Sequence, residues 1–310
     1  MLYGKKLKKG DTIGFIGPSG AVRTDDAIER AVRETERMGF RVKPGESCGQ
    51  AYGYLSGTDE LRARDLNHMF ADDSVDAIFC LKGGYGAMRM LDLIDYYLIA
   101  RHPKIFVGYS DITALHIAML EKAGLVTFHG PMPVSCWADG PMDDFTRDSL
   151  LNTLMGAPVG EIRNPEGYAR KTVSPGACEG LLVGGNLSLI VGLLGTPWEL
   201  DTKGRILFIE DVGEKTYALD RMLTHLRLAG KFEDCAGVVL GDFKNCEIEY
   251  PDYGFTLEEI VRDVVVPCGK PVFSGLQSGH CTPKITLPFG VKCRMDANEC
   301  TLTALESAVR

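Results

Sequence analysis

The chain has 310 residues, 45% of them hydrophobic, and a formal net charge of −8 at pH 7. This length provides one large or two modest domains with enough apolar side chains for a core. The acidic balance, without any basic patch interleaved with aromatic residues, argues against nucleic acid and against an anionic membrane surface as partners.

Two lysine pairs near the N-terminus, Lys5-Lys6 and Lys8-Lys9, resemble the start of a signal peptide. The apolar run that follows them is short and is broken by Gly14, Gly17 and Pro18. No apolar run in the sequence has the length that a membrane span needs. We therefore expect a cytoplasmic protein that neither crosses nor binds a membrane.

Ten cysteines are scattered between Cys48 and Cys300, and none forms a C-x-x-C pair. In a long chain without a secretion signal, this pattern predicts reduced and mostly buried thiols. No zinc-binding spacing is visible, so we expect no metal and no cofactor. Cys281, next to His280, suggests a Cys–His nucleophile pair, but sequence neighbours in an extended loop point in different directions.

Strands alternate with helices through about residue 150. The apolar runs 12–17, 41–43, 77–81, 105–109 and 126–129 are predicted strands, and 25–38 and 59–70 are predicted helices. This alternation predicts an α/β domain whose parallel sheet is covered by helices on both faces, as in Rossmann-like or flavodoxin-like folds.

Glycines lie within or directly after two of these strands. Gly14, Gly17 and Gly20 have the spacing G-x-x-G-x-x-G, which suggests a phosphate loop and hence a non-catalytic nucleotide-binding or sugar-binding protein. That spacing differs from the dinucleotide pattern G-x-G-x-x-G. The segment 83–86, Gly-Gly-Tyr-Gly, either brings a backbone N–H close to a substrate or forms a tight turn.

Ser110 ends the strand predicted for 105–109 and precedes a helical pattern that stops at Gly124. A serine at such a turn is exposed at the carboxyl edge of a sheet, and the N–H of Asp111 points to where a carbonyl oxygen acquires charge. The turn resembles a nucleophile elbow, except that Ile112 stands where the G-x-S-x-G form has glycine. The alternative is that Ser110 is a helix N-cap.

The second half of the chain begins with a connector rich in glycine and proline, which we place at 156–177 between domains 1–155 and 178–310. Strand-like runs dominate after it, at 181–183, 206–209, 238–240, 271–273, 285–287 and 300–305, with helices at 216–229 and 256–266. This pattern predicts a smaller, β-rich second domain.

A serine nucleophile needs a base, usually an imidazole that a carboxylate orients. His280 is favoured among the six histidines because it lies in a polar, glycine-rich loop. His129, at the end of a predicted strand, is the competitor. Glu210, directly after the strand 206–209, is the preferred carboxylate and Asp211 the alternative. The other histidines are expected on helix faces or in connectors: His68, His102, His116 and His225.

Several short blocks, in order along the chain, resemble the serine LD-carboxypeptidases. This family includes murein tetrapeptide carboxypeptidases and, more distantly, microcin C immunity peptidases. The blocks are LKGGYG at 81–86, VGYSD at 107–111, FHGPM at 128–132, GGNL at 184–187, IED at 209–211 and SGH at 278–280. The loop 17–20, Gly-Pro-Ser-Gly, departs from the family pattern without affecting a catalytic position.

The resemblance implies a Ser-His-Glu triad of Ser110, His280 and Glu210, with the backbone N–H groups of Asp111 and Gly84 as the oxyanion hole. It also implies a serine peptidase that releases D-alanine from a murein tetrapeptide during peptidoglycan recycling, and a homodimer. The alternative activity is that of a microcin-type peptidase on nucleotide-linked peptides. Because Ser110 falls in the first predicted domain and the other two in the second, we expect the active site where the domains meet.

A carboxypeptidase must also bind the free carboxylate of its substrate, for which Arg or Lys is the usual means. The candidates that the sequence does not rank are Arg89, Arg221, Arg227 and Lys284. Aromatic side chains that suit a pocket wall are Tyr85, Tyr109 and Trp198. A nucleotide-linked substrate would need a platform for its purine, for which the two tryptophans are Trp137 and Trp198.

Overall fold

The computed structural model describes residues 1–24, 26–156, 160–246, 248 and 253–310. The chain forms two compact units. Unit 1 comprises Met1–Ala157, Thr286–Gly290 and Ser307–Arg310, and unit 2 comprises Pro158–Ile285 and Val291–Glu306. Among the described residues, no helix combines the length and the apolar character needed to cross a membrane.

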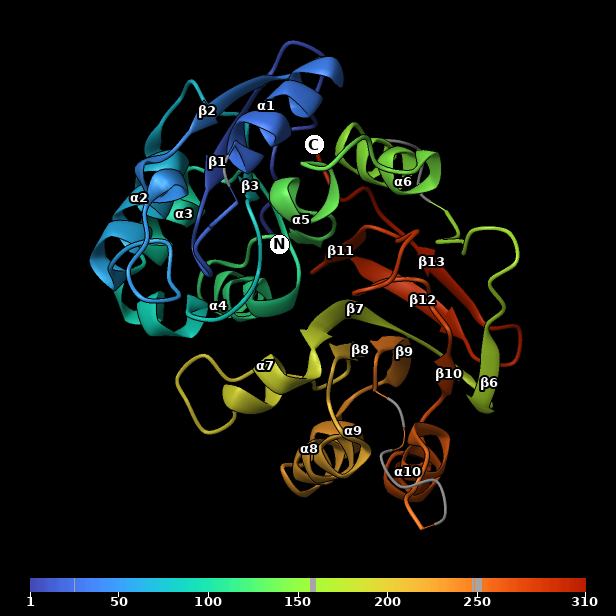
Figure 1. Cartoon of the computed structure of the whole chain (residues 1–310). Helices are drawn as coiled ribbons and strands as arrows, with labels where there is room; N and C mark the ends of the chain where they lie inside the picture. The colour runs from blue at the N-terminus through green and yellow to red at the C-terminus, as the bar shows by residue number, and fades with distance from the viewer. Residues whose placement is uncertain (25, 157–159, 247, 249–252) are drawn as a thin grey trace. The chain divides into compact units, whose positions relative to one another are not determined.

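Unit 1 is built on a six-stranded sheet in the order β11-β5-β4-β3-β1-β2. Figure 1 labels β1, β2, β3 and β11 of this sheet. The strands β1 to β5 run parallel to their neighbours, and β11 is antiparallel to β5. Their bounds, close to the predicted runs, are β1 Thr12–Ile16, β2 Arg41–Pro44, β3 Ala77–Cys80, β4 Ile105–Gly108, β5 Thr127–His129 and β11 Leu287–Phe289.

Helices cover both faces of this sheet. Parallel strands are joined by right-handed crossovers, so the outward step from β1 to β2 puts α1 on one face, and the steps from β2 to β5 put α2, α3 and α4 on the other. The helices are α1 Ala27–Arg37, α2 Asp59–Ala71, α3 Tyr96–Arg101, α4 Thr113–Ala123, α5 Pro133–Cys136 and α6 Asp144–Leu154, with 3₁₀ turns η1 Glu46–Gly49, η2 Ala87–Leu93 and η3 Ser110–Ile112. Asp25, the start of the helix predicted for 25–38, lies outside the described residues.

From β1 the chain steps to β2 at one edge of the sheet, and from β3 it steps to β4 and β5 in the opposite direction. The direction therefore reverses between β1 and β3, which are neighbours in the sheet. Loops that leave two such strands diverge, and ligands of open α/β sheets bind in the crevice at the carboxyl ends of these strands. The loop 17–20 follows β1, the loop 82–86 follows β3, and Ser110 follows β4 on the other side of β3. The strand order therefore gathers all three turns at one edge of the sheet.

Unit 2 contains a seven-stranded mixed sheet in the order β13-β12-β7-β8-β9-β10-β6. The four central strands β7 to β10 are parallel, whereas β6, β12 and β13 are antiparallel to their neighbours. The strands are β6 Lys171–Ser174, β7 Ala177–Asn186, β8 Ile206–Val212, β9 Gly237–Lys244, β10 Val272–Ser274, β12 Lys292–Asp296 and β13 Thr301–Ala304. The helical segments are α7 Leu187–Gly192, α8 Thr216–Leu228, α9 Lys231–Asp234, α10 Leu257–Val264 and η4 Val266–Cys268.

The α/β class with a parallel sheet and a second, strand-rich part is confirmed, but the chain divides differently from the expectation in three places. Ser307–Arg310, expected in the second domain, belongs to unit 1. The segment 156–177, expected to be a connector, includes β6, a short edge strand with no buried residue that gives no hydrophobic signal. The run 285–287, expected in the second domain, leads into β11, which pairs with β5 of unit 1. A pairing across so long a sequence separation leaves no mark in local composition.

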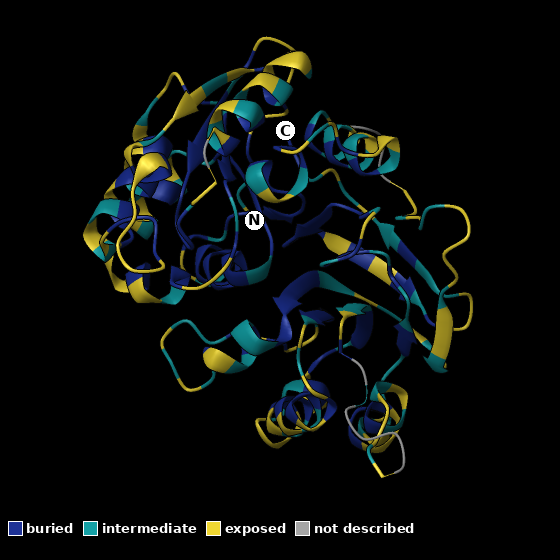
Figure 2. Ribbon diagram, in the orientation of Figure 1, coloured by how far each residue is buried: buried dark blue, intermediate teal, exposed yellow. Residues whose placement is uncertain are grey.

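Most of α4 is buried (Figure 2). His116, on this helix, lies in the core of unit 1 and is 1% exposed. Its Nε2–H donates to the Gly108 carbonyl at 2.9 Å, and its ring packs against Phe106 and Phe289. Burial lowers the pKa of this imidazole from 6.5 to about 4. The side chain thus joins α4 and β11 to the strand that ends just before Ser110.

We predict that His116 makes the protein less stable as the pH falls. The unfolded chain binds a proton near pH 6.5, whereas the folded protein resists protonation of His116 until about pH 4. Folding stability is therefore lost as the pH drops through this interval, by about 2 kcal/mol between pH 7 and pH 5. His116→Gln should remove this part of the pH dependence of the urea midpoint, measured by circular dichroism, and His68→Gln, which removes an exposed imidazole, should not. An unchanged pH dependence in His116→Gln contradicts the prediction.

Candidate active site

The structure brings together two residues that the sequence pairs as base and carboxylate. His280 Nδ1 lies 2.6 Å from Glu210 Oε2. Glu210 is 0% exposed, and this burial raises the pKa of its carboxyl group, while the hydrogen bond from His280 opposes the rise. With Nδ1–H donating to the carboxylate, Nε2 is the ring nitrogen of His280 that carries the lone pair in the neutral imidazole.

A β-bulge aligns the His280 loop with β8. Ile209 pairs with Leu240 and Asp211 pairs with Phe243, so β9 has one extra residue at this point. Within the extra stretch, the N–H of Asp242 donates to the carbonyl of Ser278 at 3.0 Å, two residues before His280. The bulge thereby attaches the loop to the edge of the sheet beside Glu210.

Gly279 explains why the loop can approach Glu210 so closely. Its φ is +119°, a conformation that side chains disfavour, and a Cβ placed on it would lie 2.6 Å from Glu210 Oε2. Ser278, which is fully buried, fixes the loop from the other side because its Oγ donates to the Ile285 carbonyl at 3.0 Å. A residue other than glycine at position 279 would displace the carboxylate.

Asp211, the alternative carboxylate, has a different set of partners. Its Oδ2 accepts hydrogen bonds from the backbone N–H and the Oγ of Ser188, at 3.0 and 2.7 Å, in the first turn of α7. Its Oδ1 accepts from Asn186 Nδ2 at 2.9 Å. Consecutive residues of a strand point to opposite faces, which explains why Glu210 contacts the histidine while Asp211 anchors α7.

Ser110 occupies a strained turn in unit 1. Its φ is +65°, in the left-handed region that non-glycine residues rarely adopt. Such strain costs on the order of 1–3 kcal/mol and concentrates at functional sites. The N-cap of η3 is Tyr109, and Ser110 is the first residue of that turn, so the N-cap alternative for Ser110 is wrong. The turn resembles a nucleophile elbow in its strained backbone, although its sequence has Ile112 in place of the second glycine of G-x-S-x-G.

The loop after β3 lies directly against this serine. A Cβ on Gly83 would come 3.0 Å from Ser110 Oγ, so only glycine fits there without a shift. The Gly83 carbonyl accepts a hydrogen bond from the Gly20 N–H at 3.3 Å, on the β1 side of the loop. A trans peptide holds its C=O and N–H in opposite directions, and β3 lies between β1 and β4. The Gly84 N–H therefore points to the β4 side, where Ser110 is.

The two backbone groups expected to form the oxyanion hole are available for a ligand. Within the described residues, neither the Gly84 N–H nor the Asp111 N–H donates a hydrogen bond. By contrast, two N–H groups of the suggested phosphate loop are used inside the protein. Gly17 N donates to Ser47 Oγ and Gly20 N donates to Gly83 O, so these two glycine amides are not available to a phosphate.

The other two residues considered for catalysis, His129 and Cys281, are buried in the protein. His129 is 1% exposed and packs against the rings of Tyr109, His116 and Phe289 in unit 1. Cys281 is buried, and burial raises the pKa of its thiol to about 12, which removes the thiolate that a nucleophile requires. The described residues contain no group of three or more ligands suited to a metal ion.

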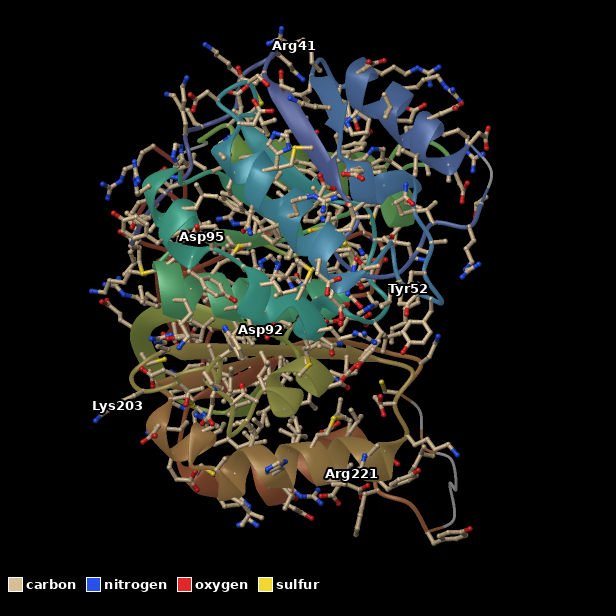
Figure 3. All side chains as sticks on the ribbon, turned by 90° about the vertical axis from the view of Figure 1, so that its left-hand side faces the viewer. Arg41, Tyr52, Asp92, Asp95, Lys203 and Arg221 are labelled. Atoms are coloured by element: carbon tan, nitrogen blue, oxygen red, sulfur yellow. The ribbon has the colours of Figure 1, made fainter. Side chains whose placement is uncertain are left out.

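The four cationic candidates for binding a substrate carboxylate differ in their surroundings. Arg89 donates twice to Asp59, through Nε at 3.0 Å and Nη2 at 2.9 Å. Arg221 and Arg227, both on α8, are exposed; Figure 3 labels Arg221. Lys284 is 4% exposed and lies in the same loop as His280. Which of them binds a carboxylate stays a prediction.

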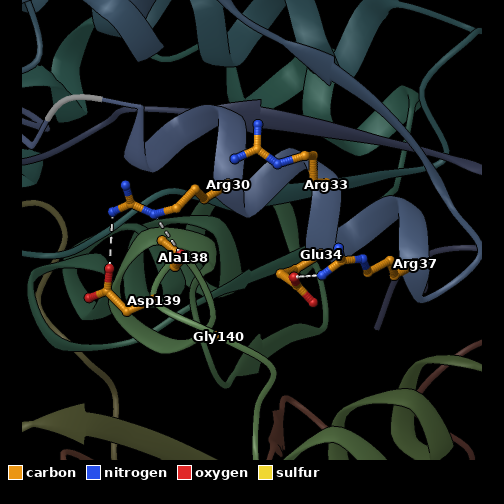
Figure 4. A pocket seen from close by; sticks show the side chains of 7 residues that line it. All are labelled: Arg30, Arg33, Glu34, Arg37, Ala138, Asp139 and Gly140. Carbon is orange, nitrogen blue, oxygen red and sulfur yellow. Dashed lines mark hydrogen bonds and ion pairs between the residues drawn. The ribbon is translucent and has the colours of Figure 1, made fainter.

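A cavity of about 600 Å³ lies between α1 and the segment 138–140 (Figure 4). Arg30, Arg33 and Arg37 line it, but carboxylates neutralise much of this charge. Arg30 donates to Asp139 at 3.0 Å, and Arg37 pairs with Glu34. This cavity contains none of the residues expected in the active site.

Comparison with known proteins identifies both halves of the chain. Residues 13–130 match the LD-carboxypeptidase N-terminal domain and residues 179–295 match the LD-carboxypeptidase C-terminal domain. A probable murein peptide carboxypeptidase of Bacillus subtilis is 42% identical over 298 residues, which are 96% of this chain and 92% of the relative.

Solved structures of related proteins superpose on all or nearly all of this chain. The microcin C7 self-immunity protein MccF, as a mutant in complex with adenosine monophosphate, superposes with a TM-score of 0.90 at 28% identity and full coverage of both chains. A muramoyltetrapeptide carboxypeptidase from Oxalobacter formigenes has a TM-score of 0.82 at 30% identity, with 94% of this chain and 97% of the other covered.

We predict that Gly279→Ala separates Glu210 from His280. The added Cβ would lie 2.6 Å from Glu210 Oε2, so the carboxylate must move and the short hydrogen bond must lengthen or break. In proton NMR spectra, the far-downfield resonance of the His280 Nδ1–H, expected for so short a bond, should disappear. Gly230→Ala is the matched control, since Gly230 also has a positive φ, of +74°, but nothing within 4 Å of its Cβ. Persistence of the resonance in Gly279→Ala contradicts the prediction.

Proposed function

The chain belongs to the LD-carboxypeptidase family, and on this basis we propose that it is a serine peptidase that removes a C-terminal D-amino acid from a murein peptide. The observation that carries the proposal is the pairing of His280 with the buried carboxylate of Glu210 at 2.6 Å. This pair is what a serine nucleophile needs from its base and orienting acid.

Ser110 is the proposed nucleophile. Its left-handed backbone at the end of β4 holds the hydroxyl at the carboxyl edge of the sheet of unit 1. The free N–H groups of Asp111 and Gly84 flank it and are suited to bind an oxyanion. Ser110 belongs to unit 1, whereas Glu210 and His280 belong to unit 2. The proposal requires the Ser110 hydroxyl to reach the Nε2 of His280 in the catalytic state.

The reaction then follows the general course of serine acyl transfer. His280 Nε2 takes the proton of Ser110 as Oγ attacks the amide carbonyl, and the N–H groups of Asp111 and Gly84 stabilise the oxyanion. His280 next gives this proton to the amine of the leaving D-amino acid. Water, activated by the same imidazole, hydrolyses the ester and restores the serine. Glu210 stays ionised and stabilises the imidazolium in both steps.

Names of related proteins support a murein peptide as the substrate. Besides the relative in Bacillus subtilis, a murein tetrapeptide carboxypeptidase of Pseudomonas aeruginosa is 29% identical over 92% of this chain. The natural substrate we propose is accordingly a murein tetrapeptide, with D-alanine as the product. A cytoplasmic location and a homodimeric state stay predictions that accompany this function.

We predict that the wild-type enzyme removes one alanine from a murein tetrapeptide and that Ser110→Ala does not. Loss of a serine nucleophile lowers kcat by on the order of 10⁶-fold in a comparable triad. Mass spectrometry of the peptide before and after incubation measures the reaction, and Ser135→Ala, which changes an exposed serine on α5, is the control. Release of alanine by Ser110→Ala at the wild-type rate contradicts the assignment of the nucleophile.

A peptidase acting on nucleotide-linked substrates is the second candidate, because structures of MccF with adenosine monophosphate and with aspartyl sulfamoyl adenosine superpose on the whole chain. A purine platform must come from elsewhere than Trp137, which is 1% exposed and donates to Thr35 Oγ1 at 3.0 Å in the core. Trp198 is half-buried. Incubation with aspartyl sulfamoyl adenosine distinguishes the candidates: release of aspartate with an intact tetrapeptide favours the second, and the reverse favours the first.

A further inference from the structure

The carboxylate of Asp111 is nearly completely buried. Only the backbone N–H of this residue is expected to take part in the reaction, as a donor of the oxyanion hole. Its side chain is 1% exposed. One oxygen, Oδ2, accepts a hydrogen bond from Ser19 Oγ at 2.5 Å and another from the backbone N–H of Ala87 at 2.8 Å. A buried carboxylate is costly unless it is hydrogen-bonded, so these contacts have a strong effect on where the neighbouring loops lie.

The two donors come from the loops after β1 and β3, so the contacts form a closed ring. Asp111 binds Ser19, the next residue Gly20 donates its N–H to Gly83 O at 3.3 Å, and the segment from Gly83 leads to Ala87, which binds Asp111 again. The ring therefore holds the segment 83–87 at both ends. It also fixes the plane of the peptide between Gly83 and Gly84, whose N–H points to the Ser110 side.

Arg62 joins the same two loops from a second direction. Its side chain is 0% exposed, and its Nη1 donates to the carbonyls of Pro18 and Gly86, the latter at 2.9 Å. A salt bridge to Asp59 compensates its charge. The loop that carries Gly84 is thus held by charged, buried groups on both sides, which is more than a simple turn requires.

We propose that Asp111 and Ser19 are positioning residues, whose buried hydrogen bond holds the Gly84 N–H in register with the Asp111 N–H beside Ser110. This inference rests on the proposed function, because it assigns a role relative to the oxyanion hole. Misplacing an oxyanion donor weakens the binding of the transition state and leaves the binding of the substrate largely unchanged.

Two variants test the proposal without removing the backbone donors. Ser19→Ala deletes one hydrogen bond of the ring, and Asp111→Asn retains an acceptor oxygen but loses the charge. Each should lower kcat on a murein tetrapeptide by on the order of 10- to 100-fold, less than deletion of an oxyanion donor itself, with KM within about twofold of wild type. Hydrogen exchange of the amides in 84–87, measured by mass spectrometry, should become faster in both variants.

Asp11→Asn is the matched control. Asp11 is also buried, at 6% exposed, and accepts a hydrogen bond from the Lys8 N–H at 2.9 Å, but it precedes β1 at the amino end of the strand. The control should keep both the wild-type kcat and the wild-type exchange in 84–87. An equal fall of kcat in Asp11→Asn overturns the proposal, because it would show a general effect of losing a buried charge.

A fluorophosphonate probe separates failure of this inference from failure of the proposed function. The serine oxygen forms a bond to phosphorus as the P–F bond breaks and fluoride leaves, and the hydroxyl proton passes to His280. The phosphoryl oxygen of the probe occupies the oxyanion position. Wild type labelled at Ser110, with slower labelling of Ser19→Ala and Asp111→Asn, supports the inference. Labelling of both variants at the wild-type rate, with unchanged kcat, overturns the inference alone. A wild type that neither reacts at Ser110 nor releases alanine overturns both.

Discussion

The buried carboxylate of Glu210 is the constraint on which the candidate active site depends. A carboxylate with 0% exposure is unfavourable unless a partner stabilises it, and His280 Nδ1 at 2.6 Å is that partner. The features around the pair serve this contact. The bulge in β9 attaches the His280 loop, and Gly279 leaves room for the carboxylate. Burial also removes competing water, so the imidazole keeps the orientation that a general base needs.

In unit 1, the proposed nucleophile Ser110 is held by a strained backbone and not by a buried ion pair. The backbone of Ser110 is strained at a φ of +65°, and strain of this kind persists only where the surroundings over-determine the conformation. The buried polar ring through Asp111, Ser19 and Gly83 provides such surroundings, because a carboxylate in the interior tolerates little movement of its donors. The strand order adds the larger-scale arrangement by bringing the turns after β1, β3 and β4 to one edge.

The sequence predicted well the features that depend on local pattern. Buried parallel strands such as 77–81 and 105–109 appear as apolar runs, and Gly124, with a φ of +66°, ends α4 as its position suggested. The alternation of strands and helices predicted the fold class. Local patterns and the family resemblance predicted the pairing of Glu210 with His280, whose hydrogen bond the structure contains.

What the sequence did not reveal depends on contacts between distant segments. The edge strand β6 has no apolar signal, and β11 joins a sheet whose other strands end at residue 129. The hydrogen bond between Ser19 and Asp111 spans 92 positions. For this reason, the sequence of the loop 17–20 did not indicate that Ser19 and Gly20 take part in the hydrogen-bonded ring that holds the segment 83–87. The bulge beside Glu210 was equally invisible, because register becomes defined only when β8 and β9 pair.

The most direct test of the central claim is a double-mutant cycle on kcat/KM with Glu210→Gln, His280→Asn and the double variant. If Glu210 acts through His280, the loss in the double variant should match that of His280→Asn within about twofold, since residues that work as a unit are far from additive. If instead the double variant loses the product of the two single effects, Glu210 acts independently of His280 and the account is contradicted.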